Sequence, residues 1–335
     1  MNRYVGYWLL GNSSLVAGMV VLGGWTRLTE SGLSMVTWSP MGEFPPINTP
    51  QWNSYFEKYK KSPEYILKND GMSMSEFKRI YYMEYAHRQL GRIVGAAYLL
   101  PTLYLTLTRK VSLPLALKLY GLTALVGGQG LLGWYMVKSG LNSKLIEDKA
   151  DARVSPYRLA SHLISAFTIY GLTLTVGLKL LKRKPPMGTP LLKTATVLTT
   201  GLAATTIISG AFVAGLDAGK IHNTFPKMGN NWTPDGMLYL EPKWKNLFEN
   251  PGTVQFTHRC LGMLTGASVL LLWLRGRKNN AGLSRHLKMP VHATALQIGL
   301  GVTTLLNHVP VPLASLHQAN SLVVFTSLLV LLGAM

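Results

Sequence analysis

Cysteine and acidic side chains are scarce in this chain. Cys260 is the only cysteine, so no disulfide forms within the chain, and the Cys-x-x-Cys-His motif that attaches haem covalently is excluded. Asp and Glu number 14 against 33 Lys and Arg, and charged residues make up only 14% of the chain. The net charge of +19 suggests nucleic-acid binding at first sight. Its placement in short loops between apolar runs indicates membrane topology instead, with no nucleic-acid partner.

Long apolar runs dominate what is present. Hydrophobic residues make up 48% of the chain, and runs of about 20 such residues recur, each long enough to cross a bilayer. The sequence therefore predicts an all-α integral membrane protein embedded in the lipid bilayer. The eight predicted spans lie at approximately 5–24, 84–107, 114–137, 157–181, 191–215, 254–275, 286–306 and 313–334.

The positions of Lys and Arg predict the orientation of the spans. Short basic loops follow the second, fourth and sixth spans, so these loops and both termini are expected on the matrix or cytoplasmic side. The long loops after the first, third and fifth spans then face the opposite side. Within the first long loop, segments near 51–61 and 74–83 are expected to form short amphipathic helices on the membrane surface.

The two halves of the chain repeat one pattern. A single shift carries His87 onto His258 and Arg88 onto Arg259, and each half continues with Gln-x-x-x-Gly and a second histidine, His162 or His317. Four spans per half preserve orientation, so two parallel four-helix-bundle repeats are expected. The predicted parts are an N-terminal half, a basic linker and a C-terminal half, at 1–181, 182–190 and 191–335.

The histidines are the strongest candidates for a functional site. Ionisable residues inside a membrane are costly and usually functional, and these four begin the even-numbered spans on one side of the membrane. One histidine from each of two facing helices can bind a haem iron, which predicts two bis-histidine haem sites. A glycine one and two turns after the first histidine of each half would leave a flat face for the macrocycle, although such spacing also permits close helix packing. These glycines are Gly91, Gly95, Gly262 and Gly266.

Arginines near the histidines fit the carboxylates of haem, because a guanidinium pairs well with a propionate. Snorkelling of arginine towards the interface is an equally good explanation. The candidates are Arg88, Arg92, Arg158 and Arg259.

One difference separates the two copies. Glu84 stands in the first copy where Gln255 stands in the second. A carboxylate can accept a proton or stabilise a developing cation, whereas an amide cannot accept the proton. This asymmetry suggests chemistry in the first half and electron transfer in the second, unless Glu84 is merely a surface residue beside the interface.

Several long motifs make the chain resemble the haem A synthase family in its mitochondrial form. They are GGWTRLTESGLS at 23–34, EYAHR at 84–88, QGLLGWYMVKSGL at 129–141, GAFVAGLDAG at 210–219, FPKM at 225–228 and FENP at 248–251. The resemblance covers essentially the whole chain. It departs from some bacterial relatives in lacking an outer-loop cysteine pair, which rules out a thiol-dependent step, and in placing His222 where an aromatic is expected.

The resemblance implies an oxidoreductase that converts haem O to haem A, for cytochrome c oxidase, by oxidising a ring methyl to a formyl group through a hydroxymethyl intermediate. It implies that His258 and His317 bind a resident haem b through its iron, that His87 and His162 hold the substrate haem O, and that Glu84 assists the oxidation.

The same resemblance implies a multi-pass protein of the mitochondrial inner membrane, with both termini in the matrix and the histidines towards the intermembrane space. A ferredoxin-like electron carrier is the implied redox partner. A contact with the haem O synthase and a homo-oligomer are left open.

Two other functions remain alternatives at this point. A di-haem b-type electron-transfer cytochrome would share both histidine pairs. A transporter built from parallel repeats would need polar midplane residues, for which Gln129, Gln297 and Pro101 are the only hints.

Overall fold

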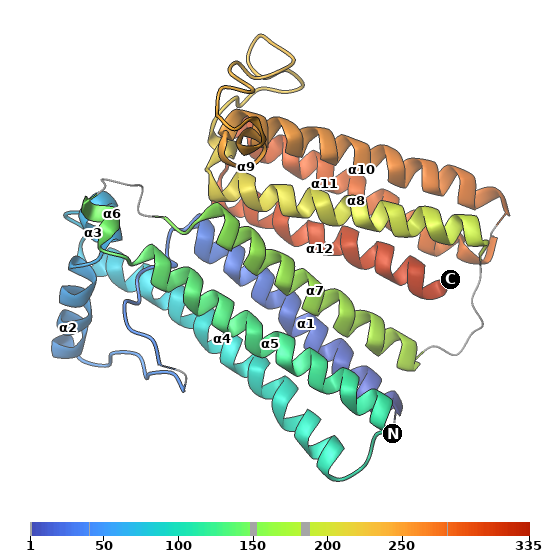
Figure 1. Cartoon of the computed structure of the whole chain (residues 1–335), viewed down its shortest axis with the longest axis horizontal. Coiled ribbons are helices and arrows are strands. Elements are labelled where there is room, and N and C mark those ends of the chain that lie inside the picture. The colour runs from blue at the N-terminus through green and yellow to red at the C-terminus, as the bar shows by residue number, and fades with distance from the viewer. Residues whose placement is uncertain (1, 40, 148–152, 182–187, 280) are drawn as a thin grey trace. The chain divides into compact units, whose positions relative to one another are not determined.

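The computed structural model describes residues 2–39, 41–147, 153–181, 188–279 and 281–335. Across these residues the regular structure is helical, apart from one isolated bridge between Met228 and Asn231 (Figure 1). The long helices are α1 (Asn2–Leu28), α4 (Met74–Leu107), α5 (Leu113–Gly140), α7 (Pro156–Leu181), α8 (Pro190–Gly215), α10 (Pro251–Asn279), α11 (Ser284–Leu306) and α12 (Val311–Ala334). The short ones are α2 (Thr49–Lys60), α3 (Pro63–Lys68), α6 (Lys144–Glu147), α9 (Asn246–Glu249), η1 (Ala218–Lys220), η2 (Lys243–Lys245) and η3 (Ala281–Leu283).

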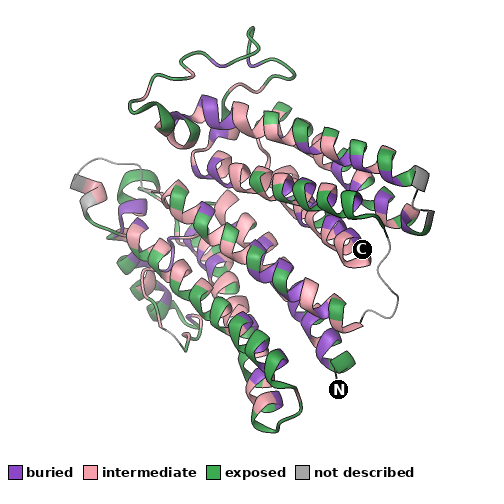
Figure 2. Cartoon of the chain, turned by 45° about the vertical axis from the view of Figure 1, so that its right-hand side comes forward, coloured by how far each residue is buried: buried purple, intermediate pink, exposed green. Residues whose placement is uncertain are grey.

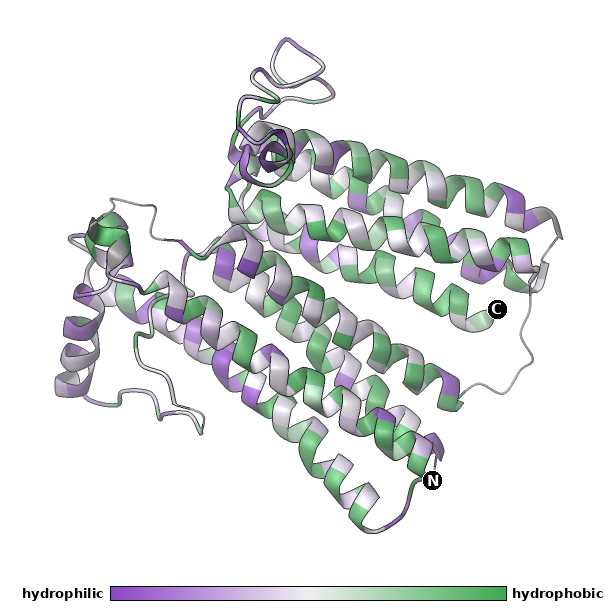
Figure 3. Cartoon of the chain, viewed as in Figure 1, coloured by the Kyte–Doolittle hydropathy of each residue, from purple (hydrophilic) through white to green (hydrophobic). Residues whose placement is uncertain are grey.

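The prediction of eight spans is confirmed. Eight helices of the described residues are long and apolar enough to cross a membrane. Exposed and hydrophobic stretches recur along the faces of these helices (Figures 2 and 3). Leu100 and Leu198, for example, are exposed by 63% and 69%. In water such faces would be unfavourable, whereas in a bilayer they contact lipid.

The helices fall into two compact units. The first, Ser14–Ile169, holds α2 to α6 together with most of α1 and the first half of α7. The second joins Met1–Ser13 to Tyr170–Met335. The expected arrangement of two parallel repeats meeting at a linker stays a prediction, and most of that linker, 182–187, lies outside the described residues.

Within the second unit, four helices pack in a closed order. Helix α8 contacts α10, α10 contacts α11, α11 contacts α12, and α12 returns to α8. Side chains from all four fill one apolar core. Its largest fully buried members include Leu283, Leu287, Leu328 and Leu331.

Helices α1 and α7 approach closely at a pair of glycines. A Cβ atom on Gly177 would lie 3.2 Å from the carbonyl oxygen of Gly6 and 3.3 Å from the Cβ of Leu9. Only small residues permit backbones to come this near in membrane helices.

Helix α4 begins much earlier than expected. The prediction of a separate surface helix at 74–83 is wrong, because this segment forms the first turns of α4. A capping box explains this start: Ser73 Oγ accepts from the Glu76 N–H, and the Glu76 carboxylate accepts from the Ser73 N–H. The prediction of a helix near 51–61 is confirmed as α2.

An aromatic cluster holds α2 and the start of α4 together. Trp52, Phe56 and Tyr59 of α2 pack on Phe77 and Tyr81 of α4, with ring centroids 4.9–6.3 Å apart. The first long loop is therefore a packed structure on the end of α4, and it fixes the backbone that surrounds Glu84.

Candidate functional sites

Each of the four predicted histidines lies against a glycine of a neighbouring span. A Cβ atom on the glycine would meet the imidazole in every case, at 2.8–3.2 Å from the nearest ring atom. The absence of a side chain is what lets each ring lie there. The pairs are Gly23 with His87, Gly133 with His162, Gly210 with His258, and Gly301 with His317.

The structure brings His258 and His317 together. Their ring centroids are 6.5 Å apart and the planes are nearly perpendicular, at 84°. When two imidazoles bind one metal ion from opposite sides, the distance between their centroids is the sum of two metal–nitrogen bonds of about 2 Å and the two distances from nitrogen to ring centre. That sum is close to the observed separation. The pair is therefore spaced for one metal ion between the two rings.

Hydrogen bonds around His258 leave its Nε2 free for a metal. Ser209 Oγ lies 2.7 Å from His258 Nδ1 and donates its own proton to the carbonyl oxygen of Thr206, also at 2.7 Å. Ser209 must then accept, so Nδ1 carries the imidazole proton. Such a partner on the far nitrogen is the usual support of a metal-binding histidine.

His317 is positioned by an amide chain. Gln297 Nε2 lies 3.2 Å from Nδ1 and 3.4 Å from Nε2 of His317, and Asn320 Nδ2 donates to Gln297 Oε1. Asn320 in turn donates to the carbonyl of Ala293 on α11. Metal binding at either ring nitrogen replaces the corresponding contact with Gln297.

The first pair is supported differently. His87 and His162 lie within electrostatic range of each other. Gln129, the counterpart of Gln297, donates to the backbone oxygen of His162 at 3.0 Å and not to its ring. His162 Nδ1 and Gln129 Oε1 are buried without a hydrogen-bond partner among the described residues. Polar atoms left unpaired in this way are expected where a ligand completes the site.

The histidine pairs fit haem better than a bare metal ion. Within the described part of the chain, no cluster of three or more His, Cys, Asp or Glu side chains gathers for a metal. A haem supplies four iron ligands itself and needs only two axial histidines. The orphaned His162 Nδ1, the spacing of His258 and His317, and the glycine-lined rings agree with that requirement.

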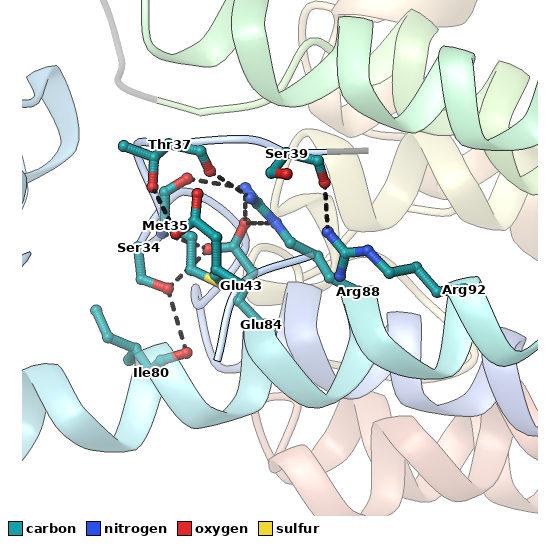
Figure 4. Close-up of polar contacts among 9 residues, drawn as sticks. All are labelled: Ser34, Met35, Thr37, Ser39, Glu43, Ile80, Glu84, Arg88 and Arg92. Carbon is teal, nitrogen blue, oxygen red and sulfur yellow. Dashed lines mark hydrogen bonds and ion pairs between the residues drawn. The ribbon is translucent and has the colours of Figure 1, made fainter. Parts of the chain in front are cut away.

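Glu84 is buried, so it is not the surface residue that the sequence left as an alternative. Its side chain is only 2% exposed, and Oε2 accepts from Ser34 Oγ and from the backbone N–H of Met35, both at 2.7 Å (Figure 4). Oε1 accepts from Nε and Nη2 of Arg88, at 3.0 and 2.6 Å. The carboxylate thus ties the loop after α1 to α4, one turn before His87.

Arg88 completes this tie. Its Nη1 donates to the carbonyl of Thr37 and its Nη2 to that of Met35. Four hydrogen bonds, two to Glu84 and two to the loop, occupy the guanidinium in this conformation. The predicted propionate contact of Arg88 would have to be made in addition to them.

Gln255 and Arg259 form the counterpart in the second half. Gln255 Nε2 donates to the carbonyls of Ala218 and Ile221, and Gln255 Oε1 accepts from Arg259 Nη2 at 2.9 Å. Arg259 also donates to the carbonyls of His222 and Lys227. His222 has a left-handed backbone (φ 46°) and binds Arg259 through its carbonyl, so its ring is not needed for this contact.

The other predicted contacts are spread more widely. Arg92 donates to the carbonyl of Ser39 (Figure 4) and also to Gln89. The guanidinium of Arg158 lies over the ring of Tyr135, 4.9 Å from its centroid. Of the predicted haem-facing glycines, Gly266 is packed, because a Cβ there would lie 2.9 Å from Ile298 Cδ1. At Gly91 the nearest atom would be Met19 Cε at 3.6 Å, and positions Gly95 and Gly262 open onto free space.

Ionisable groups of the first loop are unusually buried. Glu64 accepts a hydrogen bond from Tyr59, and burial raises the pKa of the Glu64 carboxyl from 4.5 to about 8. Burial and the neighbouring Glu43 raise the pKa of Tyr55 to about 12. Glu64 is therefore mostly neutral at pH 7 and packs as an uncharged group.

Sequence reasoning missed the glycines that contact the rings, and it missed Ser209. Two of them, Gly133 and Gly301, end the repeated Gln-x-x-x-Gly motif, which was a usable signal. Gly23 and Gly210 lie near the ends of the first and fifth spans, against His87 and His258 respectively, and are therefore equivalent positions in the two halves.

Fold and site together define a multi-pass helical membrane protein with two histidine-pair sites on glycine-lined helix faces. Comparison with known proteins specifies the family. Residues 6–329 match the COX15-CtaA model, described as cytochrome oxidase assembly protein, so the chain belongs to this family.

Relatives from plants, animals and fungi align along nearly the whole chain. It is 46% identical to "Heme A synthase COX15" of Arabidopsis thaliana over 98% of this chain and 74% of the relative. The human protein of the same name is also 46% identical, over 99% and 82%. A Schizosaccharomyces pombe "Heme A synthase-mitochondrial ferredoxin fusion protein" is 40% identical, over 98% of this chain and 59% of the fusion.

Proposed function

We propose that this protein is a haem A synthase, an oxidoreductase that converts the ring methyl of haem O to the formyl group of haem A through a hydroxymethyl intermediate. Its product would serve cytochrome c oxidase. The observation that carries the proposal is the pair of histidine sites in a chain that belongs to this family over residues 6–329.

The two sites are assigned different ligands. His258 and His317 would hold a resident haem b through its iron, supported by Ser209 and Gln297. His87 and His162 would hold the substrate haem O, where unpaired polar atoms remain at His162 and Gln129. When bound, haem b supplies electron transfer between the redox partner and the substrate site.

Glu84 would act from the loop side of the substrate site. It lies one helical turn before His87, and its negative charge is held in place by Ser34, Met35 and Arg88. A fixed carboxylate stabilises positive charge that develops at an oxidised methyl carbon. Arg92 and Arg158 would orient propionates around this site, as Arg259 would at the second, while Arg88, already bonded to Glu84, would contribute less.

The relatives support the proposed redox partner and membrane. The fungal relative joined to mitochondrial ferredoxin supports a ferredoxin-like electron donor and the mitochondrial inner membrane for this chain. Matrix-side termini, contact with the haem O synthase and a homo-oligomer remain predictions of the sequence.

The rival functions are less favoured. A di-haem electron-transfer cytochrome would use the same histidines, but the relatives are named haem A synthases. The two glutamines that hinted at a transporter are instead bonded to His162 and His317.

Chromatography of extracted haems tests the proposal. The protein is purified after expression with and without a haem O synthase. The expected result is haem b alone without the synthase, and haem O, hydroxylated haem O and haem A with it. Unchanged haem b at about two per chain in both preparations would instead indicate that the protein is an electron-transfer cytochrome.

A substitution tests the role of Glu84. Glu84→Gln is expected to retain the resident haem b and to lower haem A formation by about a hundredfold, the typical loss on removing one electrostatic stabiliser. Glu84→Asp, which keeps the carboxylate, should retain more haem A formation than Glu84→Gln and serves as the comparison. A normal yield of haem A from Glu84→Gln removes Glu84 from the mechanism.

A further inference from the structure

Glu84 with Arg88 in the first half, and Gln255 with Arg259 in the second, form two clusters that hold a loop against a helix. The two clusters make equivalent hydrogen bonds but differ in charge. In each, an arginine directly after a histidine binds the side chain four residues before it and two backbone carbonyls of the loop after the preceding span. The side chain bound is Glu84 for Arg88 and Gln255 for Arg259. The hydrogen-bonding arrangement is the same in both halves, but only the first half has a negative charge beside the arginine.

The first cluster is electrically balanced. Arg88 is paired in a two-point contact with Glu84, at 2.6 and 3.0 Å. An anionic ligand beside this pair therefore meets no net positive charge from Arg88 and Glu84 taken together.

The second cluster carries an uncompensated charge. Gln255 is neutral, and among the described residues no carboxylate pairs with Arg259. Asp217, the acid nearest the start of that loop, pairs with Lys220 at 3.4 Å, and Glu241 pairs with Lys243. Arg259 Nε is buried without a hydrogen-bond partner, so one donor of the guanidinium remains available.

We propose that Gln255 leaves Arg259 free to retain an anionic porphyrin at the second site, whereas Glu84 cancels Arg88 and so makes the first site exchangeable. The inference rests on the proposed function, in which one porphyrin stays and the other leaves as product. A guanidinium without a counter-ion attracts a propionate, while one already bonded to a carboxylate gains little from a second.

The same charge affects the redox chemistry of the retained porphyrin. Ferric iron carries one more positive charge than ferrous iron, so a nearby cation disfavours the ferric state. Net charge near a haem is one of the terms that set its reduction potential. Arg259 thus raises the potential of the second site, which favours its role as acceptor of electrons from a partner.

Substitutions that add or remove charge at Gln255, Arg259 and Glu84 test the inference. Holo-protein purified in detergent is mixed with excess apomyoglobin, and transfer of haem b is followed in the Soret region, with the reduction potential measured by spectroelectrochemistry. Gln255→Glu is expected to accelerate haem loss by on the order of tenfold and to lower the potential. Arg259→Gln is expected to do the same by removing the charge itself.

Two controls separate charge from structure. Gln255→Met removes the hydrogen bonds to Ala218 and Ile221 without adding a charge, and it should retain haem far better than Gln255→Glu. In the converse variant, Glu84→Gln, added ferric haem b should remain at the first site through gel filtration in a larger fraction than in the wild type.

Equal rates of haem loss from Gln255→Met and Gln255→Glu would overturn the inference, because the loop contact and not the charge would then retain the haem. An unchanged potential in both Gln255→Glu and Arg259→Gln would also overturn it. Failure of the proposed function is distinguishable, since the wild type would then yield no haem O oxidation or would bind no haem.

Discussion

Glycine decides where the four imidazoles can lie. In each site a ring occupies the space that a Cβ atom on the facing helix would fill. Histidine supplies the chemistry, and the opposite glycine supplies the position. The chain offers a matched comparison on α11. A Cβ atom added at Gly301 would lie 2.8 Å from His317 Cε1, whereas one added at Gly299 would meet nothing within 4 Å.

Gly301→Ala is therefore expected to displace His317 and to weaken haem retention by about tenfold, since overpacking a close contact typically costs about 1–3 kcal/mol. Gly299→Ala should leave retention near the wild-type value. The measurement is the rate of haem transfer to apomyoglobin, with the low-spin spectrum as a second readout. Equal rates for both variants would contradict the importance of this ring contact.

At the scale of elements, the start of α4 is more than a membrane span. The capping box at Ser73 and the aromatic packing of α2 extend the helix into the first loop, and His87 lies about four turns from its beginning. His162, His258 and His317 lie within about the first two turns of their helices, as expected. The extension lets α4 carry both the loop anchor and the histidine.

Glu64 should make the stability of this loop depend on pH. Its folded pKa, about 8, is above the ordinary 4.5, so the folded loop holds a proton that the unfolded loop has lost. Stability is then full below about pH 4.5 and decreases as the pH rises towards 8, by at most about 1.4 kcal/mol per pH unit.

Hydrogen exchange of the α2–α3 segment at several pH values checks this. Glu64→Gln, which keeps the shape without the titration, should protect the segment more than the wild type at pH 7.5 and about equally at pH 5. Comparison of the two proteins at each pH removes the intrinsic pH dependence of exchange. A constant difference across the range would argue against titration of Glu64.

At the scale of the whole molecule, the two histidine pairs belong to different packed units, His87 and His162 to one and His258 and His317 to the other. Each pair has its own glycines and its own loop anchor. Loss of one site is therefore expected to leave the other folded.

Histidine substitutions should act site by site. His258→Ala or His317→Ala is expected to remove the resident haem b, because a single axial histidine holds the iron far less firmly. His87→Ala should keep that haem and lose oxidation of haem O. Haem content per chain and thermal unfolding in detergent provide the measurement. Full haem retention in both second-site variants would refute the assignment of His258 and His317.

The sequence by itself determined the helical membrane class and the eight spans, and it singled out the four histidines as candidate ligands. Hydrophobic length is set by the bilayer, and a buried histidine is too costly to occur there without a role, so both are readable from composition and spacing. The start of α4 was missed because its first turns are polar and were attributed to a surface helix.

Only the tertiary structure decided which groups support those histidines. Ser209, Gly23 and Gly210 lie far along the chain from the rings that they contact, and no local pattern marks such partners. The pairing of Glu84 with Arg88 follows from helical spacing, but its burial depends on Ser34 and Met35 of a loop about 50 positions earlier. Periodicity sets which residues share a helix, whereas close contacts between helices and loops are set by packing, which requires all the elements at once.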